Sequence, residues 1–159
     1  MIDWNLAEPP TTASVDWPKP DQSVVSLEPV EEVRLRLPDG STFEADRDLK
    51  RVFLEREDDS VTLVAVYSDS LGVDAGYRLA SDWAERFELP SAPLERWRDE
   101  VTSGKEPAER NNRALTSATI DDRIGEDGPV PSVNILYSFD EEKPATVTVE
   151  LFWPPERRS

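Results

Sequence analysis

VTLVAVY, residues 61–67, and VDAGYRLASDWAERFE, residues 73–88, decide the fold. The first stretch is apolar on both faces, which is typical of a strand in the middle of a sheet. In the second, Gly76, Trp83 and Phe87 fall on one side at about 100° per residue, which predicts an amphipathic helix. Gly76 lies within this apolar stripe and would allow the helix to approach a sheet closely. A central strand followed by such a helix predicts a sheet covered by a helical layer.

The remaining strands and the second helix follow from the same periodicities. Alternating apolar residues, turns and helical spacing predict a second helix after Ser91 and strands over 33–37, 42–45, 51–56, 114–120, 133–139 and 147–153. The order is therefore β-β-β-β-α-α-β-β-β, which is typical of an α+β fold. We expect one antiparallel sheet with both helices packed on one face, and Trp83, Trp97 and Trp153 in the core.

The first thirty residues differ from the rest of the chain. Residues 1–30 hold five of the 14 prolines, together with five acids and one base, which favours an extended backbone. Trp4 and Trp17 are large and apolar, so we expect residues near Trp4 or Trp17 to lie against the sheet face or edge that the helices leave uncovered. The sequence thus predicts a proline-rich acidic N-terminal arm at 1–30 and a single α+β domain at 31–156.

The charge of the chain is strongly negative. Its 34 acidic and 18 basic residues give a net charge of −16. Such a surface repels nucleic acid and anionic lipid, and it attracts a basic protein. No apolar run approaches the roughly 20 residues of a membrane-spanning helix, so we expect no membrane insertion. Adaptation to a salty cytoplasm would produce the same excess of acids, so a binding face and salt adaptation are both open interpretations.

The residue types that carry most enzyme chemistry are missing. The sequence has no cysteine and no histidine, which excludes thiol nucleophiles, disulfides and histidine-based triads. It contains no glycine-rich phosphate loop and no serine-nucleophile motif. The acidic loop at 121–128 lacks the spacing of an EF-hand calcium loop, and Glu150 is at a strand position expected to face solvent. We therefore expect a non-enzymatic protein with no cofactor and no bound metal.

The candidate binding residues are acids in turns and loops and two tryptophans. The predicted partner-binding residues are Glu57, Asp58, Asp59, Asp69, Asp121, Asp122, Glu126, Asp127, Trp4 and Trp17. If the segments that carry these acids lie on one side of the sheet, the acids form a continuous negative rim. Such a rim would attract the lysine- or arginine-rich surface of a basic partner protein.

Two classes of function are open. The first is an acidic protein-interaction module, similar in kind to an inhibitor or an immunity protein, that binds a basic partner. The second is a small-ligand or carbohydrate-binding domain with a pocket between its layers. The N-terminus MIDWNLAEPP shows no signal peptide, so we expect a cytoplasmic protein. A leader removed ahead of Met1 would instead place the domain outside the cytoplasm, tethered through its N-terminal arm.

Overall fold

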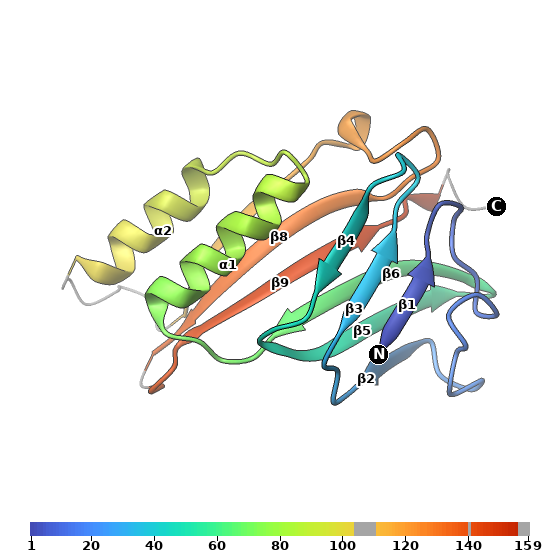
Figure 1. The fold of residues 1–159 in the computed structure, drawn as a ribbon, viewed down its shortest axis with the longest axis horizontal. Coiled ribbons are helices and arrows are strands. Elements are labelled where there is room, and N and C mark those ends of the chain that lie inside the picture. The colour runs from blue at the N-terminus through green and yellow to red at the C-terminus, as the bar shows by residue number, and fades with distance from the viewer. Residues whose placement is uncertain (104–110, 140, 156–159) are drawn as a thin grey trace.

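The architecture is a six-stranded sheet with a second layer on one face (Figure 1). The computed structural model describes residues 1–103, 111–139 and 141–155. All neighbours in the large sheet are antiparallel, and their order is β2 (Val24–Leu27), β5 (Leu49–Glu57), β6 (Ser60–Ser68), β9 (Ala145–Phe152), β8 (Val130–Ser138) and β7 (Asn111–Ser117). The central pair β6–β9 joins two distant parts of the chain, because both helices and two other strands lie between them in sequence.

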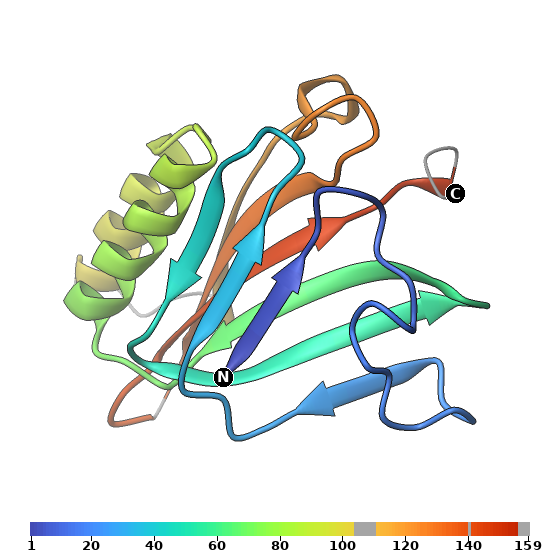
Figure 2. The same cartoon turned by 45° about the vertical axis from the view of Figure 1, so that its right-hand side comes forward.

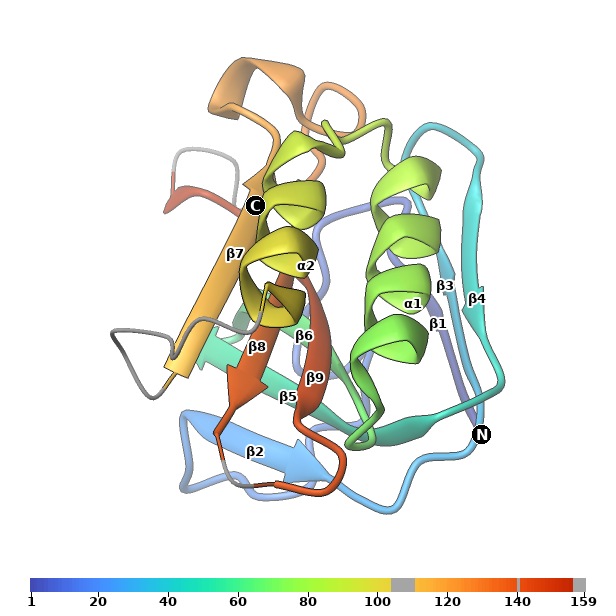
Figure 3. The same cartoon turned by 90° about the vertical axis from the view of Figure 1, so that its left-hand side faces the viewer.

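The second layer contains both helices and a small sheet. α1 (Val73–Arg86) packs on β8 and β9, and α2 (Ala92–Thr102) packs on β7. The small sheet has the order β1 (Ile2–Asn5), β3 (Val33–Arg36) and β4 (Thr42–Ala45), and β1 runs parallel to β3. Figure 2 shows α1, β4, β3 and β1 side by side in this layer, and Figure 3 shows α2 beside α1. One hydrophobic core, which includes Trp83, Trp97 and Trp153 as expected, fills the space between the layers.

Aromatic side chains join α1 to the small sheet. Phe43 of β4 lies edge-on to Trp83 of α1, with 5.6 Å between the ring centres, and it stacks on Phe87. Arg86 donates a hydrogen bond of 2.6 Å to the backbone oxygen of Glu44. The helix therefore packs on the large sheet and also contacts the edge strand β4.

α1 approaches the large sheet closely at one glycine. A Cβ atom on Gly76 would lie 2.6 Å from the Cβ of Ala145 and 3.5 Å from the side chain of Ile135. Carbon atoms in contact prefer a separation of about 3.5–4.0 Å, so a side chain at position 76 would force the helix away from the sheet. The close approach expected at Gly76 is thus confirmed.

The N-terminal segment is packed on the rest of the molecule. Trp4 (8% exposed) and Leu6 (0% exposed) are buried in the shared core, and β1 lies beside β3. Val61 donates its backbone N–H to the oxygen of Pro10 at 3.0 Å. Figure 2 shows the segment passing from the small sheet, near the end of the β5–β6 hairpin, to the edge of the large sheet. The packing expected around Trp4 is confirmed, but Trp4 belongs to the small sheet, in the same layer as the helices.

The α+β fold predicted from the sequence is confirmed, with both helices on one face of the large sheet. The strands differ from the expectation in two respects: residues 1–30 supply two further strands, β1 and β2, and the strands divide between two sheets. β1 and β2 lie in the proline-rich segment, whose composition favours an extended arm over paired strands. Residue 156, at the end of the expected domain, lies outside the described residues.

Candidate interaction surface

One face of the large sheet is left uncovered by the second layer within the described residues. Ile135 and Ala145 mark the covered face, because both lie against Gly76 of α1. Residues that pair directly across antiparallel strands share a face, so the register assigns the opposite face. Its apolar members are Val24, Phe53, Leu63, Ala65, Tyr67, Leu115, Val130, Leu136 and Phe152. Of these, Leu115 is 54% exposed, and Phe152 and Val24 are each 43% exposed. We name this surface the open face.

Glu150 lies near the centre of the open face. It is on β9 and pairs with Ala65 of β6 and Ser132 of β8, both of which have short side chains. Burial raises the pKa of the Glu150 carboxyl above its usual value of 4.5; Arg113 opposes this rise and Glu55 adds to it. The ion pairs within the described residues involve other carboxylates. Glu150 is therefore a partly desolvated acid on an exposed surface.

A Glu150→Gln variant is expected to be more stable than the wild type at neutral pH. The pKa of Glu150 is higher in the folded chain than in the unfolded chain, so stability is lost as the pH rises through the folded pKa. Below the unfolded value of 4.5 the carboxyl is protonated in both states and the penalty is absent. The gain in the free energy of unfolding, measured by urea denaturation, should therefore shrink as the pH falls from neutral toward 4.5.

The control for this measurement is Glu85→Gln, which removes the same charge from the exposed side of α1. Removal of any one acid reduces self-repulsion in a chain of charge −16. If both variants gain equal stability at every pH, net charge is the cause and burial of Glu150 is not.

Two other polar residues of the open face, Arg51 and Asn134, have distinct surroundings. The guanidinium carbon of Arg51 lies 4.2 Å from the ring centre of Tyr67 and 6.0 Å from that of Phe53. Cation–π attraction of this kind holds the guanidinium against the rings. The buried carboxamide oxygen of Asn134, on β8, has no hydrogen-bond partner in the described part of the chain. The open face thus combines apolar and aromatic groups with a larger number of polar ones, of which Arg51, Glu55, Arg113 and Glu150 carry charge.

The acids selected from the sequence lie at both ends of the large sheet. The turn at 57–59 joins β5 to β6, whereas Asp69 follows the last residue of β6. The length of a nine-residue strand separates these two positions. The acidic loop at 121–127 leads into β8, and the pairing of Val130 with Phe152 places it at the same end of the sheet as the turn at 57–59. The continuous rim is therefore divided, because Asp69 lies apart from the other acids.

The two tryptophans have different surroundings. Trp4 is buried in the core, so its side chain is not presented to a partner. Trp17 is partly exposed, and the guanidinium of Arg56 lies 5.0 Å from its ring centre. Its indole N–H donates to two backbone oxygens of the same loop, at 3.0 and 3.1 Å. A hollow of about 530 Å³ is lined by Trp17, Arg56 and Asp59, so the structure brings Trp17 next to the turn at 57–59.

Comparison with known proteins does not extend this picture. The chain matches no protein-family model, no curated protein and no solved structure. Within residues 1–103, 111–139 and 141–155, no three acidic side chains gather in a way that could hold a metal ion. In the same ranges, no helix combines the length and the apolar character needed to cross a bilayer.

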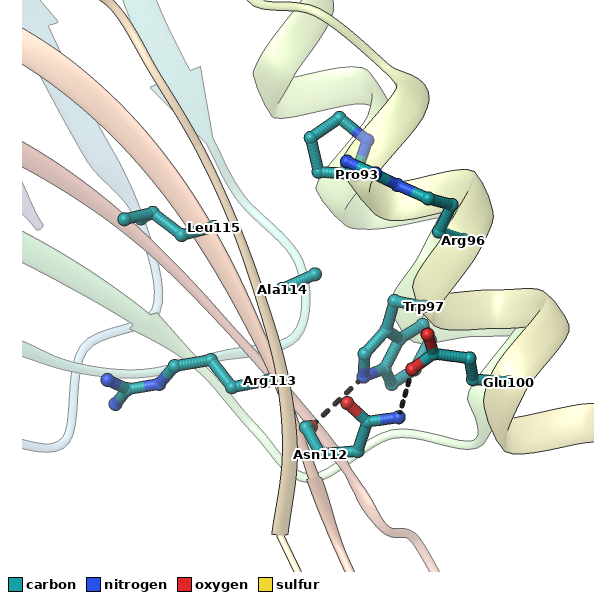
Figure 4. A pocket seen from close by; sticks show the side chains of 8 residues that line it. All are labelled: Pro93, Arg96, Trp97, Glu100, Asn112, Arg113, Ala114 and Leu115. Carbon is teal, nitrogen blue, oxygen red and sulfur yellow. Dashed lines mark hydrogen bonds between the residues drawn. The ribbon is translucent and has the colours of Figure 1, made fainter. Parts of the chain in front are cut away.

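A second hollow, of about 310 Å³, lies between α2 and β7 (Figure 4). The indole N–H of Trp97 donates to the backbone oxygen of Asn112 at 3.1 Å, and the Asn112 amide donates to the Glu100 carboxylate at 2.9 Å. These bonds attach the helix to the strand. Figure 4 shows Arg113 and Leu115 pointing away from α2, which is the direction of the open face.

The sequence of a single strand does not predict which residues make up the open face. The alternation of Val147 and Val149 with Thr148 and Glu150 correctly separates the two sides of β9. No pattern within that strand shows that Phe53 shares the side of Glu150, because this depends on the register of three neighbouring strands. The available signal was Glu150 itself, an acid inside an apolar strand.

Proposed function

We propose that this chain is a non-enzymatic interaction module of the cytoplasm that binds a basic protein, in the manner of an inhibitor or an immunity protein. The open face is the observation that carries this proposal. It presents Val24, Leu115 and Phe152 as exposed apolar groups around the partly buried Glu150. Exposed apolar area with aromatic groups is typical of the centre of a protein interface.

The charge of the surroundings supports a basic partner. The turn at 57–59 and the loop at 121–127 lie at one end of the large sheet, and Asp69 lies at the other. The acids of the loop at 121–127 take part in none of the ion pairs of the described residues. Those pairs are Arg34–Glu44, Arg36–Asp3 and Arg98–Asp99. A chain of charge −16 attracts a cationic protein before contact and speeds its association.

Site-specific photocrosslinking in the cells that express the chain identifies the partner. The crosslinking amino acid p-benzoylphenylalanine replaces Phe152 on the open face or, as a control, Glu85 on the exposed side of α1. We expect a protein with a net positive charge to be captured from position 152 and not from position 85. Capture at equal yield from both positions, or capture of an acidic protein, would contradict the proposal.

Association of the identified partner with the purified chain is expected to depend on salt and on the acids at one end of the sheet. Changing Asp58, Asp59, Asp121 and Asp122 to Asn should slow the association rate about tenfold at low ionic strength and less at high ionic strength. The matched control removes four exposed acids from the helices: Asp74, Asp82, Glu85 and Glu95. An association rate that ignores ionic strength, or that falls equally in both variants, would show that the acids of the turn and loop do not steer the partner.

A further inference from the structure

The outer edge of β7 carries backbone groups without partners. In an antiparallel strand, the N–H and C=O of one residue point in the same direction, and the direction alternates along the strand. Ala118 donates its N–H to the oxygen of Pro131 in β8 at 3.1 Å, so even-numbered residues of β7 face β8. Residues 113, 115 and 117 therefore point their backbone groups away from the sheet. The hydrogen bonds among the described residues leave these outward groups unused.

Among the described residues, this edge has only one of the usual forms of protection, the charged side chain of Arg113. Edge strands are normally kept short, interrupted by proline or occupied by lysine, because an open edge pairs with other strands. β2, the opposite edge of the large sheet, has four residues and lies between Pro20 and Pro29. β7 has seven residues and contains no proline, glycine, lysine or acid. Its outward residues are exposed, so the edge is accessible.

α2 forms a wall beside the open edge. The hollow between them is lined by Pro93 and Trp97 from the helix and by Ala114 and Leu115 from the strand (Figure 4). Peptide-binding domains use a free sheet edge to add an extended ligand as a further strand. We name this hollow, with the outer edge of β7, the edge slot.

A second copy of the chain fits the edge slot poorly. α2 packs on β7 itself, and paired strands lie about 4.8 Å apart. If two copies paired through β7, the α2 helix of each copy would come within about the strand spacing of the other α2 helix. Packed helices need about 8–10 Å between their axes, so the two helices would collide. An extended segment without a flanking helix avoids this collision.

The charges of the edge slot differ from those of the whole chain. Arg96 of α2 and Arg113 of β7 are exposed, and the ion pairs of the described residues include neither of them. The acid in the lining, Glu100, already accepts a hydrogen bond from Asn112. At physiological salt, charges beyond about 8 Å are largely screened, so these arginines have more influence on a bound segment than the net charge has.

We propose that the edge slot binds an extended segment of another protein, which adds to β7 as a seventh strand of the large sheet. Its residue opposite Arg113 is acidic and its residue opposite Leu115 is apolar, because cross-strand pairs on one face contact each other. This site goes beyond the proposed function, since it recognises a carboxylate and main-chain groups, while the open face and its acids attract a basic surface.

Amide hydrogen exchange of the full chain, followed by NMR, tests the proposal directly. The probe is the acetylated and amidated peptide Thr-Thr-Val-Thr-Glu-Thr-Thr, which places Val opposite Leu115 and Glu opposite Arg113 in an antiparallel pair. In the free chain, we expect slow exchange at the even positions of β7 and fast exchange at 113, 115 and 117. A saturating concentration of the peptide should slow the exchange of these three amides at least tenfold, because they become hydrogen-bonded to the added strand.

Two altered peptides separate the two parts of the proposal. A peptide methylated on alternate backbone nitrogens cannot donate to β7 and should not protect the three amides. A peptide with Lys in place of Glu should bind at least threefold more weakly, because Lys would face Arg113. Equal binding of the Lys peptide, or binding of the probe without protection at 113, 115 and 117, would overturn the proposal.

The matched protein variants are Leu115→Pro and Leu115→Ala. Proline is tolerated on an edge strand where the N–H faces solvent, so Leu115→Pro removes an outward donor and keeps the pairing with β8. We expect it to weaken binding of the probe at least tenfold, whereas Leu115→Ala, which loses only the side-chain contact, should weaken binding less and keep the protection at 113, 115 and 117. Unchanged affinity in Leu115→Pro would overturn the proposal, and the methylated peptide gives the same test without any change to the protein. Failure of the basic-partner experiments, with these results intact, would contradict the proposed function alone.

Discussion

Deletion of residues 1–22 is expected to remove most of the stability of the chain. The deletion eliminates β1 and takes the buried side chains of Trp4, Leu6 and Val15 out of the core. Burial of one large apolar side chain contributes about 1.5–3 kcal/mol, so these three together contribute roughly 5–9 kcal/mol. Domains of this size have a free energy of unfolding of about 5–15 kcal/mol, so we expect a melting temperature that is strongly lowered or no cooperative transition.

Circular dichroism and binding of a dye that recognises exposed apolar surface measure the result of this deletion. The single substitution Leu6→Ala provides a milder comparison and should cost about 2–5 kcal/mol, because Leu6 is fully buried. Limited proteolysis of the intact chain gives an independent check. Rapid cleavage throughout residues 1–22, with an unchanged melting temperature of the product, would show that the segment does not contribute to the core.

Trp83→Ala is expected to have the largest effect of any single substitution in α1. Trp83 is 2% exposed and contacts Phe43 of the small sheet edge-on. Its removal leaves a cavity at the point where the helix, the large sheet and the small sheet meet. Substitution of a buried tryptophan by alanine costs about 3–5 kcal/mol, so the urea midpoint should fall strongly.

The matched control is Glu85→Ala, two residues further along the same helix and exposed. Alanine and glutamate have similar helix propensities, so this change should alter the free energy of unfolding by less than about 0.5 kcal/mol. If Trp83→Ala and Glu85→Ala unfold at similar urea concentrations, Trp83 does not link the layers. Native Trp83 fluorescence that soluble quenchers reach freely would lead to the same conclusion.

Local patterns in the sequence predict most of the individual elements. The apolar stripe through Gly76 and Trp83 corresponds to the buried side of α1, and the run at 61–67 lies in β6, an interior strand of the large sheet. Both signals depend on spacing within one element, and such spacing is a direct consequence of helix and strand geometry. The same spacing predicts the buried positions of Trp83, Trp97 and Trp153.

The relations between distant elements could not be predicted in the same way. The parallel pairing of Ile2–Asn5 with Val33–Arg36 produces a second sheet, and neither four-residue strand indicates its partner. Asp69 and the turn at 57–59 are close in sequence but lie at opposite ends of β6, because an extended strand separates its two ends. The candidate site depends on such relations: Glu150 becomes prominent only after β5, β6, β8 and β9 are aligned.

The position of β9 between β6 and β8 has a consequence for the order of folding. β6 is completed at residue 68, but its second neighbour begins at residue 145, so one of its edges stays open while the intervening chain is synthesised. Pairings of such large sequence separation form slowly, because a long loop must close before any contact forms. During that interval VTLVAVY is an uncharged β-forming segment with an unpaired edge, which is the type of segment that aggregates. Arrival of β9 closes this edge and joins the two halves of the large sheet in one step.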